Sequence, residues 1–318
     1  MAVLPFVASR SACAPYPPPL SYNEGKGHLS VNPVCGCALG CPYCLNLADG
    51  IGRERRVLSP VRDLVQALEE RRALVRQLRL SVMDFCDPFD PTVLPVLREL
   101  LESLQDRLPG QVVLLTTRLH PGPTWLDWLR SLGLRVSVFV SLGDATGRVP
   151  PVTPVAPRLQ LLEDCRDREL HSVMLVRPLV REWTDPASLR RLLAHAEGTC
   201  DEVVLSGLQL SPPVEASLKA AGWPVPVVPA GDSGGLAPDF RASVRALAAN
   251  VVRTVPVSEH RSCAINRRLR LRCVVTRQAK PGAGPGASAL CVMSCCGPDV
   301  TAGAPVRVDG YCRLKVAA

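Results

Sequence analysis

Short aliphatic runs alternate with amphipathic segments along most of the chain, and this alternation limits the possible folds more than any other feature. The runs show little polar alternation, as expected of strands that are covered on both faces. They are Leu29–Val34, Arg79–Met83, Gln111–Thr117, Arg135–Leu142, Ser172–Val176 and Glu202–Leu208. Six strands in series, each followed by a helical segment, predict a parallel sheet with right-handed crossovers. Such a sheet is either doubly wound or a partial (β/α)6 TIM-type barrel.

Start signals support the helices between these runs. Each helical segment has apolar residues on one face and begins at a Pro or at a capping residue. The starts are Ser59-Pro60, Pro123, Asp185-Pro186 and Asp239. The last pattern, Asp239–Asn250, precedes the apolar run Val251–Val257.

Composition divides the 318 residues into three parts. Residues 1–27 are rich in Pro and predict an extended arm. Residues 28–257 carry the β–α pattern and form the predicted barrel. Residues 258–318 form a Cys-rich C-terminal extension, which includes a Gly- and Pro-rich linker at 279–289.

Three cysteines follow directly after the first predicted strand. Cys37, Cys41 and Cys44 have the spacing C-x3-C-x2-C, with Tyr43 before the last one. Three thiolates so close in sequence can hold one iron–sulfur cube, with each thiolate on a different iron. A cube has four irons, so one iron stays open to a substrate or cofactor. A zinc knot is the alternative, although zinc sites usually combine C-x2-C pairs.

This cysteine loop resembles that of the radical S-adenosylmethionine (SAM) superfamily, and the β–α units of residues 28–210 resemble the partial barrel of that superfamily. The resemblance implies that Cys37, Cys41 and Cys44 hold a [4Fe–4S] cluster whose open iron binds SAM. It also implies that one electron from the cluster cleaves SAM to a 5′-deoxyadenosyl radical, which abstracts hydrogen from a substrate. The cofactors carry this chemistry, while the protein binds, positions and excludes water.

Within the superfamily, the strand ends are similar to those of the spore-photoproduct-lyase-like branch. The counterparts are Met83–Pro91, Thr116–Arg118, Val140–Asp144 and Ser262–Ala264. Cys86 and Arg118 depart from the pattern of that branch. The similarity implies SAM contacts at these strand ends and does not carry over a DNA-repair activity.

Acidic and hydroxyl side chains at the strand ends are candidates for binding SAM. Asp84 and Asp87 are possible acceptors for the SAM amino group, which is a cation. Ser141 and Asp144 could form hydrogen bonds with the ribose hydroxyls. Pro-bounded turns and ordinary loop capping are the alternative explanation for these residues.

Four further residues are candidates for cofactor binding or chemistry. Arg118 and Arg177 could meet the SAM carboxylate or the substrate, and Tyr43 shields the cluster or lies near the adenine. The thiol of Cys86 could return a hydrogen atom to the product. A buried structural cysteine is the more common role for such a residue.

Cysteines of the C-terminal extension form a possible second metal site. An auxiliary iron–sulfur cluster or a zinc ion is one interpretation of these residues, and unpaired thiols or a redox pair are the others. The residues are Cys273, Cys291, Cys295, Cys296 and Cys312, with Cys263 as a further candidate.

Charge and hydropathy limit the partners and the location. The net charge of +8 comes from scattered Arg residues, which favours a solvated surface over a nucleic-acid site. No apolar run is long enough to span a bilayer, and the N-terminus has no signal-peptide pattern. Cysteines in metal-like spacing predict a reducing cytoplasm.

These features predict a radical SAM enzyme that acts on a small-molecule, peptide or nucleotide substrate and takes electrons from a donor such as flavodoxin or ferredoxin. One alternative is a non-catalytic iron–sulfur or zinc protein in electron transfer or regulation. The other is repair or modification of nucleic acids.

Overall fold

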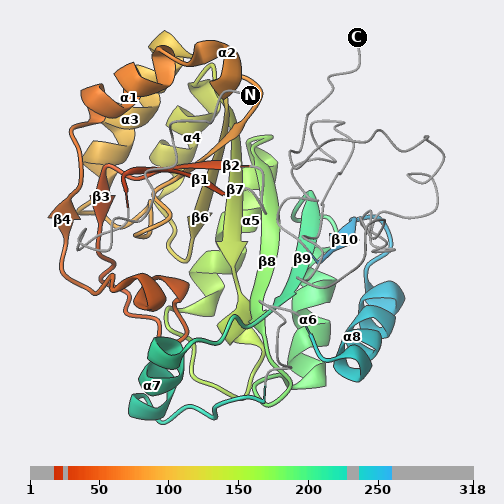
Figure 1. Cartoon of the computed structure of the whole chain (residues 1–318). Coiled ribbons are helices and arrows are strands. Elements are labelled where there is room, and N and C mark those ends of the chain that lie inside the picture. The colour runs from red at the N-terminus through yellow and green to blue at the C-terminus, as the bar shows by residue number, and fades with distance from the viewer. Residues whose placement is uncertain (1–17, 24–27, 228–235, 260–318) are drawn as a thin grey trace, which may run out of the picture.

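Parallel strands lie side by side in sequence order in one sheet, which confirms the predicted partial barrel (Figure 1). The computed structural model describes residues 18–23, 28–227 and 236–259. Within them the barrel strands are β2 (His28–Val31), β5 (Arg79–Val82), β6 (Val112–Thr117), β7 (Arg135–Ser141), β8 (His171–Leu179) and β9 (Glu202–Gly207).

Two short strands form the edges of this sheet. β1 (Leu20–Asn23) pairs antiparallel with β2, so the end of the predicted N-terminal arm joins the sheet. β10 (Val257–Ser258) pairs parallel with β9 at the other edge. Because the strand order ends at β1 and β10, the barrel is partial.

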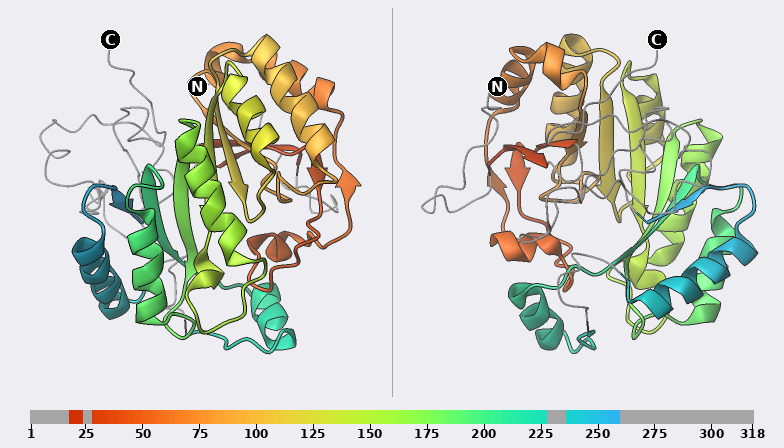
Figure 2. Two further views of the ribbon diagram at one scale, coloured as in Figure 1. Left: turned by 180° about the vertical axis from the view of Figure 1, so that it is seen from behind. Right: turned by 45° about the vertical axis from the view of Figure 1, so that its right-hand side comes forward.

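Helices cover the outer face of the sheet. In the left view of Figure 2, the helices that follow β5 to β8 lie in front of the strands. Leu97, Leu100 and Leu104 of α3 are completely buried against that face. The α-helices of the described residues are α1 (Val61–Glu69), α2 (Arg72–Val75), α3 (Leu94–Arg107), α4 (Pro123–Ser131), α5 (Val155–Asp167), α6 (Pro186–Ala196), α7 (Pro212–Ala220) and α8 (Pro238–Val251). Of these, α7 lies at one end of the sheet instead, where Val214 and Leu218 pack with Cys41 and Leu47 (Figure 1).

The inner face of the barrel has its own small apolar cluster. Alternate residues of each strand point inward, and those of β6 to β9 pack together, with Phe139 in their midst. The buried members of the cluster are Leu114, Phe139, Val173, Leu175 and Val204. The centre of the barrel is therefore filled with side chains below the level of the strand ends.

The first strand is shorter than its apolar run predicts. The run Leu29–Val34 is split into β2 and β3 (Val34–Cys35), because Pro33 cannot donate a ladder hydrogen bond. β3 pairs antiparallel with β4 (Arg56–Val57). Among the described residues, no helix has the length and apolar character needed to cross a membrane.

Candidate functional site

The β3–β4 pair closes a loop that carries the three cysteines. Cys37 N donates to Gly52 O at 3.2 Å, and Gly36 N donates to Phe85 O at 3.1 Å, which ties the loop to the segment after β5. Gly36 has φ +93°, and a Cβ atom there would lie 1.9 Å from Glu54 O. The base of the loop is therefore too narrow for any residue but glycine.

The thiols of Cys37, Cys41 and Cys44 are free and half-buried. Burial raises the pKa of each thiol, that of Cys41 to about 12. Negative charge on Cys44 or Cys37 raises the pKa of Cys41 further. The Cys41 thiol therefore lies close enough to the other two thiols for their charge to affect its pKa.

Donors surround these sulfur atoms. The backbone N–H groups of Leu39 and Asp87 lower the pKa of the Cys37 thiol, against the larger effect of burial. The backbone N–H groups of Asn46 and Leu47 and the charge of Arg118 likewise lower the pKa of the Cys44 thiol. Such donors stabilise the thiolate, which is the form that binds a metal.

The described residues do not form a ready-made site for a single metal ion. Within the residues that the structure describes, no three His, Cys, Asp or Glu side chains converge as the ligands of one metal ion do. A zinc ion with bonds of about 2.3 Å draws its sulfur ligands together. The thiolates of a cube bind different irons and stay further apart.

Asp87 joins the ends of β5 and β6 beside the cysteine loop. Its Oδ1 accepts a hydrogen bond from Thr117 Oγ1 at 2.7 Å, and its Oδ2 accepts one from Arg118 N at 2.7 Å. Burial raises the pKa of Asp87 to about 6 in spite of these donors. The carboxylate fixes the position at which Arg118 leaves β6.

Arg118 belongs to a buried group of charges. Arg118 Nη1 lies 3.0 Å from Asp144 Oδ1, and Arg158 Nη1 of α5 lies 2.6 Å from the same atom. Burial opposes the ionisation of Asp144, but the guanidinium groups of Arg118 and Arg158 outweigh it and hold its pKa below the usual range. The charge of Arg118 also reaches the cysteine loop, where it lowers the pKa of the Cys41 and Cys44 thiols against the larger effect of burial.

Tyr43 connects the cysteine loop with two distant segments. Its ring centroid lies 5.8 Å from that of Trp183, after β8, and 5.4 Å from that of Trp223, after α7. The Arg118 guanidinium lies 5.1 Å from the centre of the Tyr43 ring. The Tyr43 hydroxyl is buried and has no hydrogen-bond partner among the described residues. The ring thus packs the loop against Arg118.

Asp84 lies on the inner side of the barrel. Its Oδ2 accepts a hydrogen bond from Ser30 Oγ at 2.5 Å, and its Oδ1 accepts one from Ser81 Oγ at 2.6 Å. Asn46 of the cysteine loop donates to Asp84 O at 2.9 Å, and His28 Nε2 lies 3.9 Å from Asp84 Oδ2. The residue therefore links the loop to β2 and β5.

Ser141 and Arg177 meet through the backbone. Ser141 Oγ donates to Arg177 O at 3.3 Å. Directly after β7, a Cβ atom on Gly143 would lie 2.2 Å from Arg177 C, so the two chain segments touch there. The hydroxyl and Asp144, both expected at the ribose, thus make internal contacts, and their role toward SAM remains a prediction.

Cys86 is buried beside the loop. Its Sγ lies 3.9 Å from Met83 Sδ. Burial raises the pKa of the Cys86 thiol far above its usual value, and nearby negative charges on Cys37 and Asp87 add to the effect. The thiol is therefore protonated at neutral pH, which is the state that a hydrogen-atom donor needs.

The structure brings most of the predicted site residues to one end of the sheet. The cysteine loop, Tyr43, Asp84, Cys86, Asp87, Arg118 and Asp144 are connected through the contacts above. The proposed second metal site is different, because its cysteines lie outside the described residues. They are Cys273, Cys291, Cys295, Cys296 and Cys312.

Sequence reasoning missed Arg158, Trp183 and Trp223. Arg158 has a weak signal, since it falls on the apolar face of α5 that also carries Leu161, Leu162 and Cys165. A cation on such a face needs a buried partner, but the sequence does not say which one. Trp183 and Trp223 follow no motif.

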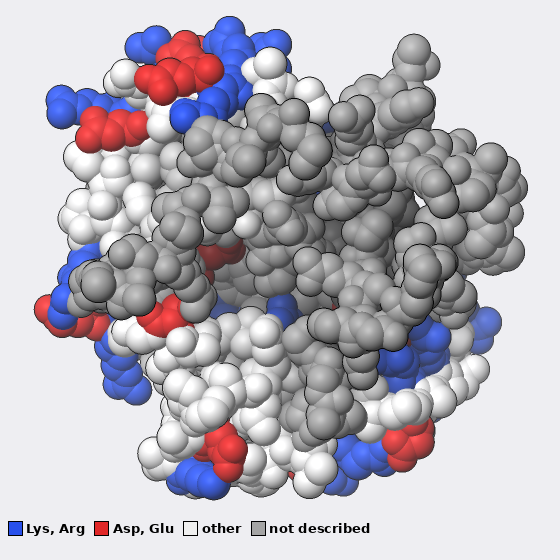
Figure 3. Space-filling view, in the orientation of Figure 1, with Lys and Arg blue, Asp and Glu red and all other residues white. Residues whose placement is uncertain are grey.

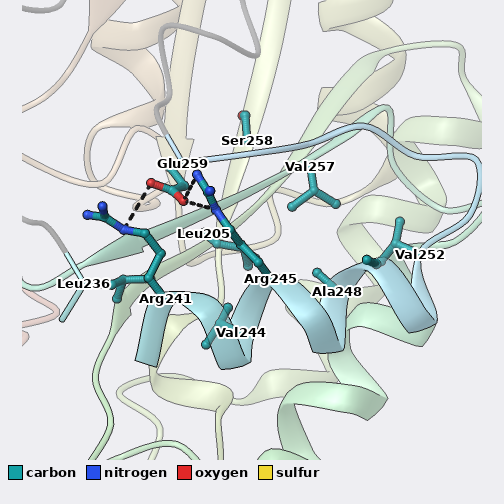
Figure 4. A pocket seen from close by; sticks show the side chains of 11 residues that line it. Leu205, Leu236, Arg241, Val244, Arg245, Ala248, Val252, Val257, Ser258 and Glu259 are labelled. Carbon is teal, nitrogen blue, oxygen red and sulfur yellow. Dashed lines mark hydrogen bonds and ion pairs between the residues drawn. The ribbon is translucent and has the colours of Figure 1, made fainter. Parts of the chain in front are cut away.

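Two cavities lie away from this site. One, of about 230 Å³, lies between α8 and the β9–β10 edge, where Glu259 joins Arg241 and Arg245 (Figure 4). The other, of about 700 Å³, includes His171 and Cys200 at the amino ends of β8 and β9. Neither contains a residue of the cysteine loop.

Solved structures of spore photoproduct lyase have the same fold. A variant with dinucleoside spore photoproduct has a TM-score of 0.56 and 12% identity, over 76% of this chain and 78% of that chain. Another variant has a TM-score of 0.55 and 12% identity, and the match covers 82% of this chain and 80% of that chain. A third is described with bound AdoMet and dinucleoside spore photoproduct. It has a TM-score of 0.53 and 12% identity, and the match covers 73% of this chain and 76% of that chain. No family model matches the sequence, and no curated protein matches it either.

Proposed function

We propose that this protein is a radical SAM enzyme. The observation that carries the proposal is the place of the cysteine loop: three half-buried thiols follow the first parallel strand of a barrel with the fold of spore photoproduct lyase. A related structure is described with bound AdoMet, which is SAM. In a barrel of this kind, chemistry gathers at the carboxyl ends of the strands.

Cys37, Cys41 and Cys44 are the residues that would hold a [4Fe–4S] cluster, and the cluster would bind SAM. When bound and given one external electron, the cluster and SAM would supply the radical chemistry that removes a hydrogen atom from the substrate, with methionine and 5′-deoxyadenosine as products. The chain itself binds the cofactors, positions them and excludes water.

Arg118 is the residue that we assign to the SAM carboxylate. Its guanidinium is held by Asp144 on one side and lies against the Tyr43 ring on the other. No hydrogen bond from its other two nitrogen atoms is found among the described residues. These two nitrogen atoms can donate hydrogen bonds to an anionic group on the cluster side.

Cys86 is the proposed hydrogen donor to the product. Its raised pKa keeps the S–H bond intact at neutral pH, and the thiol is buried close to Cys37 of the cysteine loop. To become a thiol again, the resulting thiyl radical would need one electron from the donor together with a proton, or a hydrogen atom from 5′-deoxyadenosine. Which of these occurs decides whether SAM is consumed or regenerated.

The substrate and the electron donor are proposed here by class. A small molecule, a peptide or a nucleotide is the proposed substrate, and flavodoxin or ferredoxin is the proposed donor in the cytoplasm. On the face shown in Figure 3, basic side chains of described residues are interspersed with acidic ones. That face offers little support for a nucleic-acid substrate.

Iron content and SAM cleavage test this function. Anaerobic reconstitution of the wild type should load a cluster, and Cys37→Ala, Cys41→Ala and Cys44→Ala should each lose it together with formation of 5′-deoxyadenosine. Cys200→Ala is the matched control, since Cys200 is also half-buried but lies at the opposite end of the sheet. If all four variants keep the same iron and the same activity, the proposal is wrong.

A further inference from the structure

The side chain of Asn32 is completely buried, yet neither its nitrogen nor its oxygen has a hydrogen-bond partner in the part of the chain that the structure describes. A carboxamide offers two N–H donors and an acceptor oxygen. Buried polar side-chain atoms nearly always have a partner, because an unpaired one costs free energy. A group that enters the site would satisfy this amide.

Asn32 points into the barrel at its carboxyl end. Its backbone N donates to Pro19 O at 2.8 Å, so the extended chain of β2 continues up to this residue. Alternation places Asn32 on the same face as Ser30, whose hydroxyl bonds to Asp84 inside the barrel. Val31, between them, packs in the outer core. The next residues lead into the cysteine loop.

A second unpartnered polar atom lies at the same level of the inner face. Ser30 pairs with Ser81, and Ser81 pairs with Leu114. Two residues further along the strands, the same register brings Asn32 level with Thr116. The Thr116 hydroxyl is buried and also lacks a partner among the described residues. With one strand between them, the two backbones are about 10 Å apart.

Met83, level with both on the strand between them, departs from the regular alternation. Alternation along β5 would point this side chain inward, beside Asn32 and Thr116. Instead Met83 has φ 62°, a left-handed conformation that is rare for a residue other than glycine, and its side chain packs in the outer core. The turn also brings Asp84 inward, where it bonds to the serines one level below.

We infer that Asn32, together with Thr116, binds a neutral ligand edge that presents a hydrogen-bond donor next to an acceptor, as amides, lactams and nucleobases do. A carboxamide forms two hydrogen bonds with such an edge, as asparagine does with adenine. An apolar ligand would leave the amide unpaired. This assignment rests on the function proposed above, and the edge can come from two sources, the adenine of SAM or the second substrate.

Protein unfolding tests whether the amide is free for a ligand. In the full-length chain, Asn32→Leu should leave the urea midpoint unchanged or raise it, because it removes unpaired polar atoms without changing the size of the side chain. Ser172→Ala is the control: Ser172 Oγ is likewise buried and unpartnered among the described residues, but it lies on the outer face of β8. If Asn32→Leu lowers the urea midpoint while Ser172→Ala leaves it unchanged, the Asn32 side chain stabilises the fold, and the inference is overturned.

Binding of uracil tests the chemistry of the edge. Saturation-transfer NMR should show that millimolar uracil binds the wild type and Ser172→Ala but not Asn32→Leu. The probe 1,3-dimethyluracil has the same carbonyl groups without the N–H donors, and it should not bind. If Asn32→Leu leaves the uracil signal unchanged, or if the wild type gives no signal, the inference is wrong.

SAM cleavage without substrate then separates the two sources. If the adenine is the ligand, the KM for SAM rises about tenfold in Asn32→Leu, as expected for a lost hydrogen bond. If the second substrate is the ligand, that KM stays the same while uracil binding is lost. The unfolding and uracil measurements do not depend on SAM cleavage, so a failure of the proposed function is recognised separately by the absence of 5′-deoxyadenosine.

Discussion

Arg158 Nη1 lies 2.6 Å from Asp144 Oδ1, and neither side chain is exposed to solvent. Arg158 also donates to Ser141 O at 2.8 Å and to Thr153 O at 2.7 Å. One helix therefore fixes the carboxylate that in turn holds Arg118 beside the cysteine loop. The stability of this end of the barrel and the position of Arg118 depend on the same buried charges.

Replacing Arg158 should destabilise the fold strongly. Arg158→Met leaves Asp144 with one cation and leaves the carbonyl groups of Ser141 and Thr153 without this donor, which should lower the free energy of unfolding by about 3–5 kcal/mol. Urea unfolding of the apoprotein measures this change. Arg62→Met is the control, because Arg62 is exposed and its loss should change stability by less than about 0.5 kcal/mol. Equal effects of the two changes would contradict this account of the charge group.

The depressed pKa of Asp144 predicts a dependence of stability on pH. A carboxylate whose pKa is lower in the folded state contributes stability above its unfolded pKa of about 3.9 and loses it as the pH falls through the folded value. Wild type should therefore exceed Asp144→Asn in urea midpoint at pH 7, and the difference should shrink below about pH 4. A difference that is constant over this range would show that Asp144 is not stabilised as an anion.

Gly36 should be essential for the cysteine loop. In Gly36→Ala the added Cβ would lie 1.9 Å from Glu54 O, so the β3–β4 pair must open and iron binding should be lost. Gly50→Ala is a matched control with φ +72° and no atom within 4 Å of the added Cβ. It should cost only about 1–2 kcal/mol of backbone strain and should still load iron. If both variants lose iron, the close contact of residue 36 with Glu54 O is not what makes Gly36 necessary for iron binding, and the prediction is wrong.

The Tyr43 hydroxyl should contribute less to stability than the indole of Trp183, against which the Tyr43 ring packs. Tyr43→Phe removes a buried hydroxyl that lacks a partner among the described residues, so the free energy of unfolding should stay the same or rise by about 1 kcal/mol. Trp183→Phe removes the hydrogen bond from Trp183 Nε1 to Pro224 O at 2.8 Å and leaves a cavity. It should lower stability by about 1–3 kcal/mol. Thermal unfolding compares the two, and a larger loss for Tyr43→Phe would refute this assignment.

The sequence predicted the barrel because its strands are local apolar runs and its helices have strong start signals. It predicted the cysteine loop because spacing alone brings Cys37, Cys41 and Cys44 together. Arg158 and Trp183 could not be found in this way, since their contacts depend on tertiary packing between segments far apart in the chain. The inward turn of Asp84 was equally hidden, because it depends on the left-handed conformation of Met83.

Formation of 5′-deoxyadenosine by the anaerobically reconstituted protein, reduced with dithionite in the presence of SAM, is the most direct test of the central claim. We predict that the wild type forms 5′-deoxyadenosine and that Cys37→Ala, Cys41→Ala and Cys44→Ala form none. A wild-type protein that carries a reduced cluster and leaves SAM intact would contradict the claim and would indicate a non-catalytic iron–sulfur protein.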